Sequence, residues 1–229
     1  MSAANDSSLQ LSTPVPEDAS LGERAYFELR DRIVSLRLRP GALVHEEEVM
    51  EDLGMSRTPI REALLRLAQE KLVVVIPRRG TFVTDVHVGD VGTVYEFRRE
   101  LEVAAAGWAA ERRREADIPA IEEIISELSA FPESPPPNVD ARSQLVSDRR
   151  AHILIYRLGG NQLMEDTLNS YYFLAARIWF LASGRVTMNE PFTSLIQVLR
   201  AVRDGDAEAA RLHAREHSKA AEAAIRAAL

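Results

Sequence analysis

A single stretch of β-branched residues interrupts a chain that otherwise shows helical periodicity. In LVVVIPRRGTFVTDV, from Leu72 to Val86, valine, isoleucine and threonine flank a turn at Pro77 to Gly80. This pattern predicts a two-stranded hairpin with a basic tip. Any fold for the chain must therefore place one small hairpin between two groups of helices.

Three helical segments precede the hairpin. The first shows apolar residues at helical spacing, namely Tyr26, Leu29, Ile33 and Leu36, and the sequence RPG at Arg39 to Gly41 is expected to end it. A second, short helix follows in EEEVMEDLGM. The third begins after Ser56, a candidate N-cap residue. Three helices followed by a hairpin indicate a winged helix-turn-helix, which we expect to span residues 21–86.

The third helix is unusually basic for this chain. Between Ser56 and Arg79 there are six basic and two acidic residues, a local charge of +4, whereas the whole chain has a net charge of -7 and the remainder therefore carries -11. The arginines of GMSRTPIREALLRL either form a solvated helix face or a surface for phosphate. The neighbouring basic hairpin tip and the acidic remainder favour the phosphate-binding interpretation.

The rest of the chain predicts a second, all-α domain over residues 87–229. Its expected helices number six or seven, and we place six of them at Val91 to Arg114, Ile118 to Ala130, Asp140 to Leu158, Gln162 to Ser183, Pro191 to Asp204 and Ala207 to Ala228. Residues 1–20 are rich in Ser, Asp, Asn and Pro and are expected to form a disordered arm. The predicted fold class is mainly α, with two domains.

Composition excludes several kinds of chemistry. The chain has no cysteine and five histidines, so disulfides, Cys-ligated zinc and thiol catalysis are excluded, and any metal must be held by histidine and carboxylate. No apolar run approaches the roughly 18 residues of a membrane span, and the N-terminus lacks the order of a signal peptide. A cytoplasmic protein without a membrane partner is expected.

Several motifs carry a resemblance to a known family. "PG", "LG.SRTP.REAL.RL" and "P.RGTFV" occur in this order, and together they resemble the N-terminal domain of GntR-type bacterial transcription regulators. The helical remainder resembles the FCD effector domain of their FadR subfamily. The resemblance implies a homodimeric regulator, expected to be a repressor, that binds a palindromic double-stranded operator. It also implies a small-molecule effector, often a carboxylate, and in many cases a divalent metal.

The expected DNA contacts lie on the third helix and on the hairpin. A recognition helix meets the major groove with its N-terminal residues, and arginine contacts both guanine edges and phosphate. The candidates are Ser56, Arg57, Thr58 and Arg61, then Arg66 as a backbone contact or a solvated residue, and Arg78, Arg79 and Gly80 at the wing. Glu47 lies near the position where the fatty-acid-responsive FadR has a DNA-contacting arginine. The operator sequence of that regulator is therefore not expected to be the operator of this protein.

A metal site is expected in the second domain. Asp148 and His152 are four residues apart on one helical face, a workable chelating pair, and the resemblance adds His217 as a third ligand for zinc or nickel. His213 has the same four-residue spacing from His217 but is expected at the surface. The family's fourth ligand, a histidine, falls near Leu195 here. The alternatives are an exposed Asp148 and His152 pair and a surface His217.

Arg98 and Arg177 are the candidate contacts to an anionic effector. The resemblance places Arg98, together with Glu102, in the first FCD helix, and Arg177 is a lone cation among apolar residues. A buried ion pair with a nearby carboxylate is the alternative role for Arg98. A metal-dependent enzyme is disfavoured because the chain shows no nucleophile and base pair and no cofactor loop. A metal-free sensor of a longer acyl ligand stays open because of Leu195.

Overall fold

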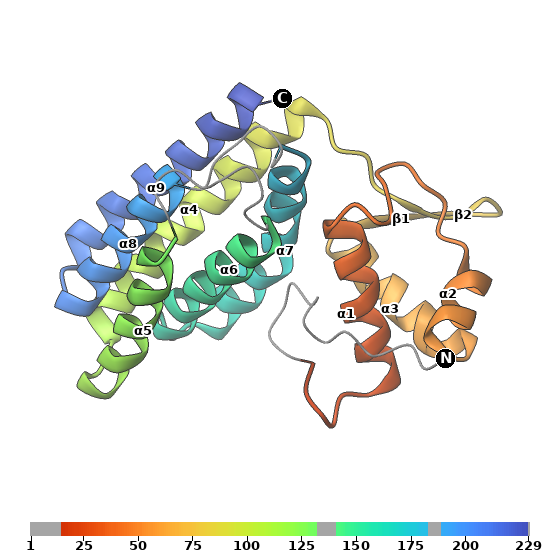
Figure 1. Ribbon diagram of the computed structural model, residues 1–229, viewed down its shortest axis with the longest axis horizontal. Helices are drawn as coiled ribbons and strands as arrows, with labels where there is room; N and C mark the ends of the chain where they lie inside the picture. The colour runs from red at the N-terminus through yellow and green to blue at the C-terminus, as the bar shows by residue number, and fades with distance from the viewer. Residues whose placement is uncertain (1–14, 132–140, 183–188, 229) are drawn as a thin grey trace. The chain divides into compact units, whose positions relative to one another are not determined.

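The chain folds into two compact units that meet in sequence between Val86 and His87. The computed structural model describes residues 15–131, 141–182 and 189–228, and each unit is treated separately (Figure 1). Most of the expected N-terminal arm, residues 1–14, lies outside the described residues. Its end at Ser20 caps the first helix, because the Ser20 hydroxyl accepts from the Glu23 N–H at 3.2 Å while the Glu23 carboxylate accepts from the Ser20 N–H at 2.9 Å.

The first unit contains three helices and a hairpin in the predicted order. They are α1 (Leu21–Val34), α2 (Glu46–Leu53), α3 (Arg57–Gln69), β1 (Val73–Ile76) and β2 (Gly80–Val83). The strands are antiparallel, with Val73 opposite Val83, and an isolated bridge from Leu43 to Phe82 adds a second, short pairing. This arrangement confirms the winged helix-turn-helix.

The first helix ends earlier than the sequence predicted. Leu36 was expected on its apolar face and the RPG sequence was expected to stop it, but α1 ends at Val34. Leu36 takes a left-handed backbone conformation with φ of 61°, which a continuing α-helix cannot contain. The Ser35 hydroxyl and N–H bond to the Asp31 carbonyl and satisfy the last turn.

The core of the first unit holds α3 against α1. Leu29 and Ile33 of α1 and Ile60 and Leu67 of α3 are fully buried. The turn before α3 depends on Gly54, which ends α2 in the left-handed conformation with φ of 62°. Burial of one face of α3 leaves its opposite face exposed to solvent.

The second unit is an all-α bundle, as predicted. Within the described residues its helices are α4 (Val88–Arg112), α5 (Ile118–Ser129), α6 (Ala141–Leu158), α7 (Gln162–Ala182), α8 (Asn189–Asp204) and α9 (Ala207–Ala228), with a 3₁₀ turn, η2 (Glu115–Asp117), before α5. The long α4 packs along α9 and also contacts α6, α7 and α8 (Figure 1). Buried alanines on α4, among them Ala105, Ala106 and Ala109, permit this close approach.

Candidate functional site

The N-terminal half of α3 presents its arginines to solvent. The side chain of Arg57 is 52% exposed and that of Arg61 is 61% exposed, and Ser56 and Thr58 are exposed beside them. Ser56 occupies the N-cap position, as predicted, but its side chain makes no capping hydrogen bond. The expected major-groove residues therefore lie together at one exposed helix end.

Two carboxylates of α2 face these arginines. Arg61 Nε donates to Glu46 Oε2 at 3.1 Å, and Arg57 Nη2 lies 3.6 Å from Glu47 Oε1. Exposed ion pairs of this kind contribute little stability, so they are readily exchanged for contacts to phosphate. They do reduce the positive charge that α3 offers to any nucleic acid.

Arg66 has a different environment from Arg57 and Arg61. Its guanidinium lies 3.7 Å from the centre of the Tyr26 ring and its Nε lies 3.6 Å from Glu70 Oε1. Tyr26 in turn donates its hydroxyl hydrogen to the buried Glu70 carboxylate at 2.7 Å. Arg66 therefore connects α3 to α1, and a contact from Arg66 to the DNA backbone stays a prediction.

The hairpin tip places Arg78 and Arg79 at the surface. Both are exposed, and Arg78 has φ of 64° while Gly80 has φ of 108°. A Cβ at Gly80 would also lie 2.9 Å from a Leu43 methyl, so glycine suits this turn for two reasons. The hairpin tip is therefore a tight, basic turn that follows the recognition helix in the sequence.

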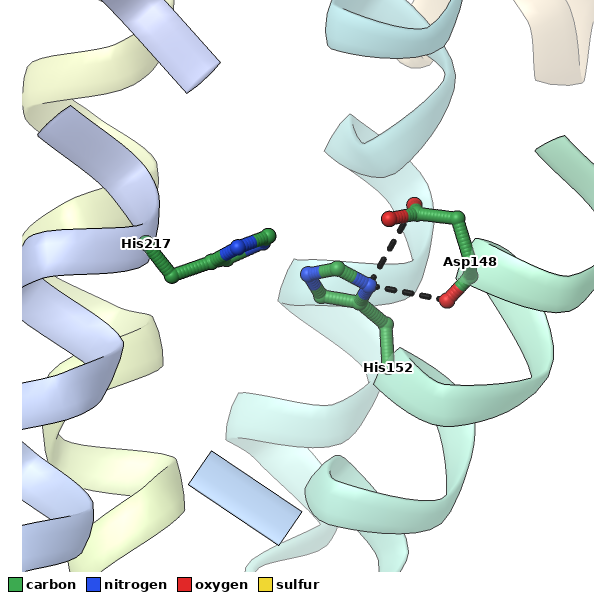
Figure 2. Close-up of side chains that lie close together, drawn as sticks. All are labelled: Asp148, His152 and His217. Atoms are coloured by element: carbon green, nitrogen blue, oxygen red, sulfur yellow. Dashed lines mark hydrogen bonds and ion pairs between the residues drawn. The ribbon is translucent and has the colours of Figure 1, made fainter. Parts of the chain in front are cut away.

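Asp148, His152 and His217 form one buried cluster in the second unit. Asp148 and His152 come from α6 and His217 from α9, and Figure 2 shows the His217 ring pointing across toward the other two residues. One ligand atom from each lies within 4.8 Å of the others. The residues are 7%, 3% and 6% exposed, respectively. The alternatives of an exposed Asp148 and His152 pair and a surface His217 are therefore wrong.

Hydrogen bonds orient both imidazole rings of the cluster. His152 Nδ1 lies 2.9 Å from the backbone carbonyl oxygen of Asp148, and His217 Nδ1 lies 3.0 Å from Ser194 Oγ. Metal-binding histidines commonly donate one ring N–H to a carbonyl or another oxygen while the second nitrogen binds the ion. Tyr172 donates its hydroxyl hydrogen to Asp148 Oδ2 at 2.7 Å. The rings and the carboxylate are thus held in place.

The cluster shifts the pKa values of its members in different directions. Burial, aided by the nearby His152, lowers the pKa of His217 to about 4. Burial opposes charge on His152 as well, but the Asp148 carboxylate outweighs it and raises the pKa of His152. For Asp148, burial is outweighed by His152 and His217, and its pKa falls below the usual range. An ionised carboxylate and a neutral His217 are the protonation states that coordinate metals, whereas a protonated His152 would have to release its proton when a metal binds.

Leu195 lies beside the cluster, at the position where the sequence comparison with the family placed a fourth ligand. It is 1% exposed, and it lines a small cavity together with His152 and His217. Its side chain is apolar, so it closes one side of the cluster without supplying a ligand atom. His213 is partly exposed with Nδ1 3.2 Å from Glu216 Oε2, and within the described residues it is not part of the cluster.

Arg98 lies beside the cluster in a buried ion pair. Its Nη2 is 2.6 Å and its Nε 2.9 Å from Glu102 Oε1. Burial opposes charge on Glu102, but Arg98 outweighs it and lowers the pKa of this carboxyl. Arg98, Glu102 and the three cluster residues line a cavity of about 40 Å³. The sequence left two roles open for Arg98, a buried ion pair or a position in an effector cavity. In the structure Arg98 forms the ion pair and also lines the cavity.

Arg177, the second expected effector contact, is buried on α7 but does not line that cavity. The sequence reasoning missed other cavity residues. Tyr172 and Trp179 have the helical spacing of core residues and were expected in the core, and Tyr95 and Ser218 were not considered as cavity residues, yet all four line the cavity. Only Ser218 had a local signal, because it follows His217 in the sequence.

The fold and these two sites define a class of two-domain transcription regulators, with a winged DNA-binding unit and a helical unit that encloses a polar cavity. Residues 21–83 match the bacterial regulatory proteins of the gntR family, and residues 93–220 match the FCD domain. The chain belongs to the GntR family of transcription regulators that carry an FCD domain. It is therefore assigned as a regulator and not as an enzyme.

Similar proteins agree with this assignment. The chain is 41% identical over 80 residues to an HTH-type transcriptional regulator from Streptomyces ambofaciens, a match covering 35% of this chain and 34% of the relative. It is 27% identical over 190 residues, 82% of both chains, to the transcriptional repressor RspR of Escherichia coli. The chain thus spans about a third of the length of the first relative.

A solved structure shows the same fold. The E. coli protein McbR/YncC has a TM-score of 0.78 at 22% identity, covering 90% of this chain and 97% of that one. None of the helices in the described ranges is both long and apolar enough to cross a membrane.

Proposed function

We propose that this protein is a homodimeric repressor whose DNA binding is controlled by a small carboxylate effector, which binds in the FCD domain at a divalent metal. The observation that carries the proposal is the buried cluster of Asp148, His152 and His217 beside a cavity that also contains Arg98. Relatives support the repressor role, since RspR carries that name.

For DNA recognition, the proposal assigns direct contacts to the exposed end of α3. Arg57 and Arg61 would contact guanine edges or phosphates in the major groove, with Ser56 and Thr58 beside them. Arg78 and Arg79 at the wing tip would contact phosphates or the minor groove. Two copies related by a two-fold axis would read two half-sites, so the proposed operator is palindromic.

The residues of the cluster fit a divalent metal. Two imidazoles and one carboxylate suit zinc or nickel. The contacts from His152 to the Asp148 carbonyl and from His217 to Ser194 fix the orientation of the two rings, as hydrogen bonds to metal-binding histidines commonly do. A bound ion would supply concentrated positive charge for the effector carboxylate. Because Leu195 brings no ligand atom, a coordination position is left for water or for that carboxylate.

Arg98 would add positive charge to the same cavity. Its guanidinium is neutralised by Glu102, so it stays buried without an unpaired charge. An effector carboxylate would share this guanidinium. The cavity of about 40 Å³ disfavours the longer acyl ligand that the sequence left open, since a single water already requires about 10–15 Å³.

Effector binding controls DNA only if it distinguishes two states of the dimer. A ligand that binds both arrangements of the two DNA-binding units with equal affinity does not change their relative populations. The proposal therefore requires that the effector favour an arrangement whose recognition helices do not match the two half-sites.

Metal binding by the wild type and two variants tests the proposal. Purified protein would be stripped with a chelator, dialysed against zinc or nickel, and analysed for bound metal, followed by calorimetric titration. We expect about one ion per chain in the wild type and at least about a tenfold loss of affinity in His152→Ala. His213→Ala, which removes a histidine outside the cluster, serves as the matched control and is expected to bind like the wild type.

Two outcomes of this titration would contradict the metal assignment. Protein that holds no zinc or nickel after dialysis would remove it entirely. Equal losses in His152→Ala and His213→Ala would show that the metal binds elsewhere on the chain.

A further inference from the structure

Glu47 places a carboxylate beside the arginines that are proposed to contact DNA. Its side chain is 88% exposed, and its Oε1 lies 3.6 Å from Nη2 of Arg57 at the start of α3. The neighbouring Glu46 has a different environment, because its side chain is 26% exposed and its Oε2 accepts from Arg61 Nε at 3.1 Å. Glu46 is therefore hydrogen-bonded to the recognition helix, whereas Glu47 extends into solvent next to Arg57.

A carboxylate in this place restricts which DNA the protein binds tightly. The phosphates of DNA repel it, and so do the acceptor atoms of the major groove, among them guanine O6 and N7 and thymine O4. An ionised carboxylate only accepts hydrogen bonds, and it loses hydration when DNA covers it. Tight binding therefore requires a DNA sequence that offers Glu47 a hydrogen-bond donor.

The major groove offers two such donors, the N4 amino group of cytosine and the N6 amino group of adenine. Adenine places its acceptor N7 beside the amino group, and this lone pair repels a carboxylate, so cytosine is the better partner. The distance of 3.6 Å between Glu47 Oε1 and Arg57 Nη2 is close to the rise of one base step, about 3.4 Å. The two side chains can therefore contact the same base pair or neighbouring base pairs.

We propose that Glu47 determines operator specificity by accepting a hydrogen bond from the N4 amino group of a cytosine, at or next to the base pair that Arg57 contacts. This inference rests on the proposed function, which places Arg57 in the major groove. Arg57 donates to guanine and Glu47 accepts from cytosine, so the two side chains read the DNA by opposite hydrogen-bonding chemistry. Thymine in place of that cytosine presents an acceptor to the carboxylate and is rejected.

Selection of bound sites from a random duplex library tests the inference with the full-length protein. Wild type, Arg57→Ala, Glu47→Ala and Glu48→Ala would each select sites separately. We expect the wild type to select a cytosine in each half-site, at or beside the position whose preference is lost in Arg57→Ala. Glu47→Ala is expected to lose the cytosine preference at that position alone. Glu48→Ala removes the same charge from the next residue of α2, which is also exposed, and is expected to select the wild-type sequence.

A base analogue isolates the proposed hydrogen bond. An operator with 2-pyrimidinone in place of that cytosine lacks the amino group but still pairs with guanine. Fluorescence anisotropy at fixed salt is expected to show a loss of affinity of about fivefold or more for the wild type. Glu47→Ala is expected to bind the two duplexes with affinities within about twofold of each other, because the hydrogen bond is already absent. Thermal unfolding of the variant confirms that the winged unit is folded.

The outcomes separate this inference from the proposed function. Selected sites that are the same for wild type and Glu47→Ala would overturn the inference and leave DNA recognition by α3 standing. Adenine or thymine at the position that depends on Glu47 would overturn the choice of cytosine. No loss from the analogue in the wild type, or an equal loss in Glu47→Ala, would also overturn the inference. If the wild type selects no sequence at all, the proposed DNA recognition and the inference both fail.

Discussion

The two units of the protein use charged side chains in opposite ways. In the winged unit Arg57 and Arg61 lie at the surface, more than half exposed, and each has an α2 carboxylate beside it. In the FCD domain Arg98, Asp148 and His152 are almost completely buried, and each is bonded to a specific partner. The first arrangement suits a large external polyanion, and the second suits a small ligand.

This difference has an energetic basis. An exposed arginine keeps its hydration until it meets phosphate, and its contribution to binding depends on salt. A buried charge has already lost hydration and must be compensated inside the fold. The recognition helix can therefore lose the charge of Arg57 or Arg61 at little cost in stability, whereas the FCD cluster ties its charges to the positions of α4, α6 and α9.

The largest predicted effect is on DNA binding in the exposed arrangement. Arg61→Ala is expected to weaken binding to an operator selected from a random duplex library by about tenfold to a hundredfold, because one direct contact is lost. Fluorescence anisotropy at fixed salt measures this. Arg215→Ala removes one exposed arginine from α9 and serves as the control. Equal effects of the two substitutions would remove the recognition-helix assignment.

Adding a fourth metal-ligand side chain tests the buried cluster of the FCD domain. Leu195→His is expected to raise zinc affinity by about tenfold or more, because a third imidazole would enter the cavity lined by His152 and His217. Competition with a chelating dye measures the change. Leu195→Met conserves volume without an imidazole and should bind zinc like the wild type. Unchanged affinity in the histidine variant would contradict the placement of Leu195 at the cluster.

A smaller effect is expected from the carboxylates that face the recognition helix. Glu47→Gln removes the charge 3.6 Å from Arg57 and is expected to tighten binding to random duplex DNA by about twofold to fivefold, the scale of an exposed ion pair. Glu48→Gln changes the same charge one residue away and has no such contact. Equal tightening in both variants would indicate a general charge effect in place of a local one.

The smallest predicted effect concerns stability and pH in the winged unit. Burial raises the pKa of Glu70 above its ordinary value of 4.5, against the lowering effect of Tyr26 and the nearby arginines. The folded state then binds more protons than the unfolded state just above this pH, so the contribution of Glu70 to the unfolding free energy falls as pH rises.

Urea denaturation of wild type and Glu70→Gln across this pH range checks the sign. The stability of the wild type relative to the variant should decrease as pH rises from about 4.5 through the raised pKa. Glu62→Gln, which changes an exposed carboxylate on α3, serves as the control for the loss of one negative charge. A wild type that gains relative stability over this range would show that the pKa of Glu70 is lowered.

The sequence predicted the fold and the cluster to different extents. Local signals sufficed for the hairpin and for the placement of Asp148 and His152 on one helical face, because they act within one element. The end of α1 was wrong because Leu36 kept the apolar spacing of a helix while its backbone left it.

The cavity depends on contacts between helices that no local pattern encodes. Tyr172 and Trp179 have the spacing of core residues, and only packing brings Tyr172 to Asp148 and Trp179 to the cavity. Arg66 likewise follows Arg61 in a basic helix, yet it lies over Tyr26 of α1. Sequence spacing predicts which face a residue occupies, but its partner on the next helix comes from the fold.

The most direct test of the account is the coupling between the two units. Operator affinity would be measured with and without a small carboxylate, succinate as the probe, at saturating zinc, in wild type and in His152→Ala. We expect the carboxylate to weaken operator binding of the wild type by about fivefold to 150-fold, the usual range of allosteric coupling, and to leave His152→Ala unaffected. The same weakening in both proteins, or no weakening in the wild type, would contradict the account.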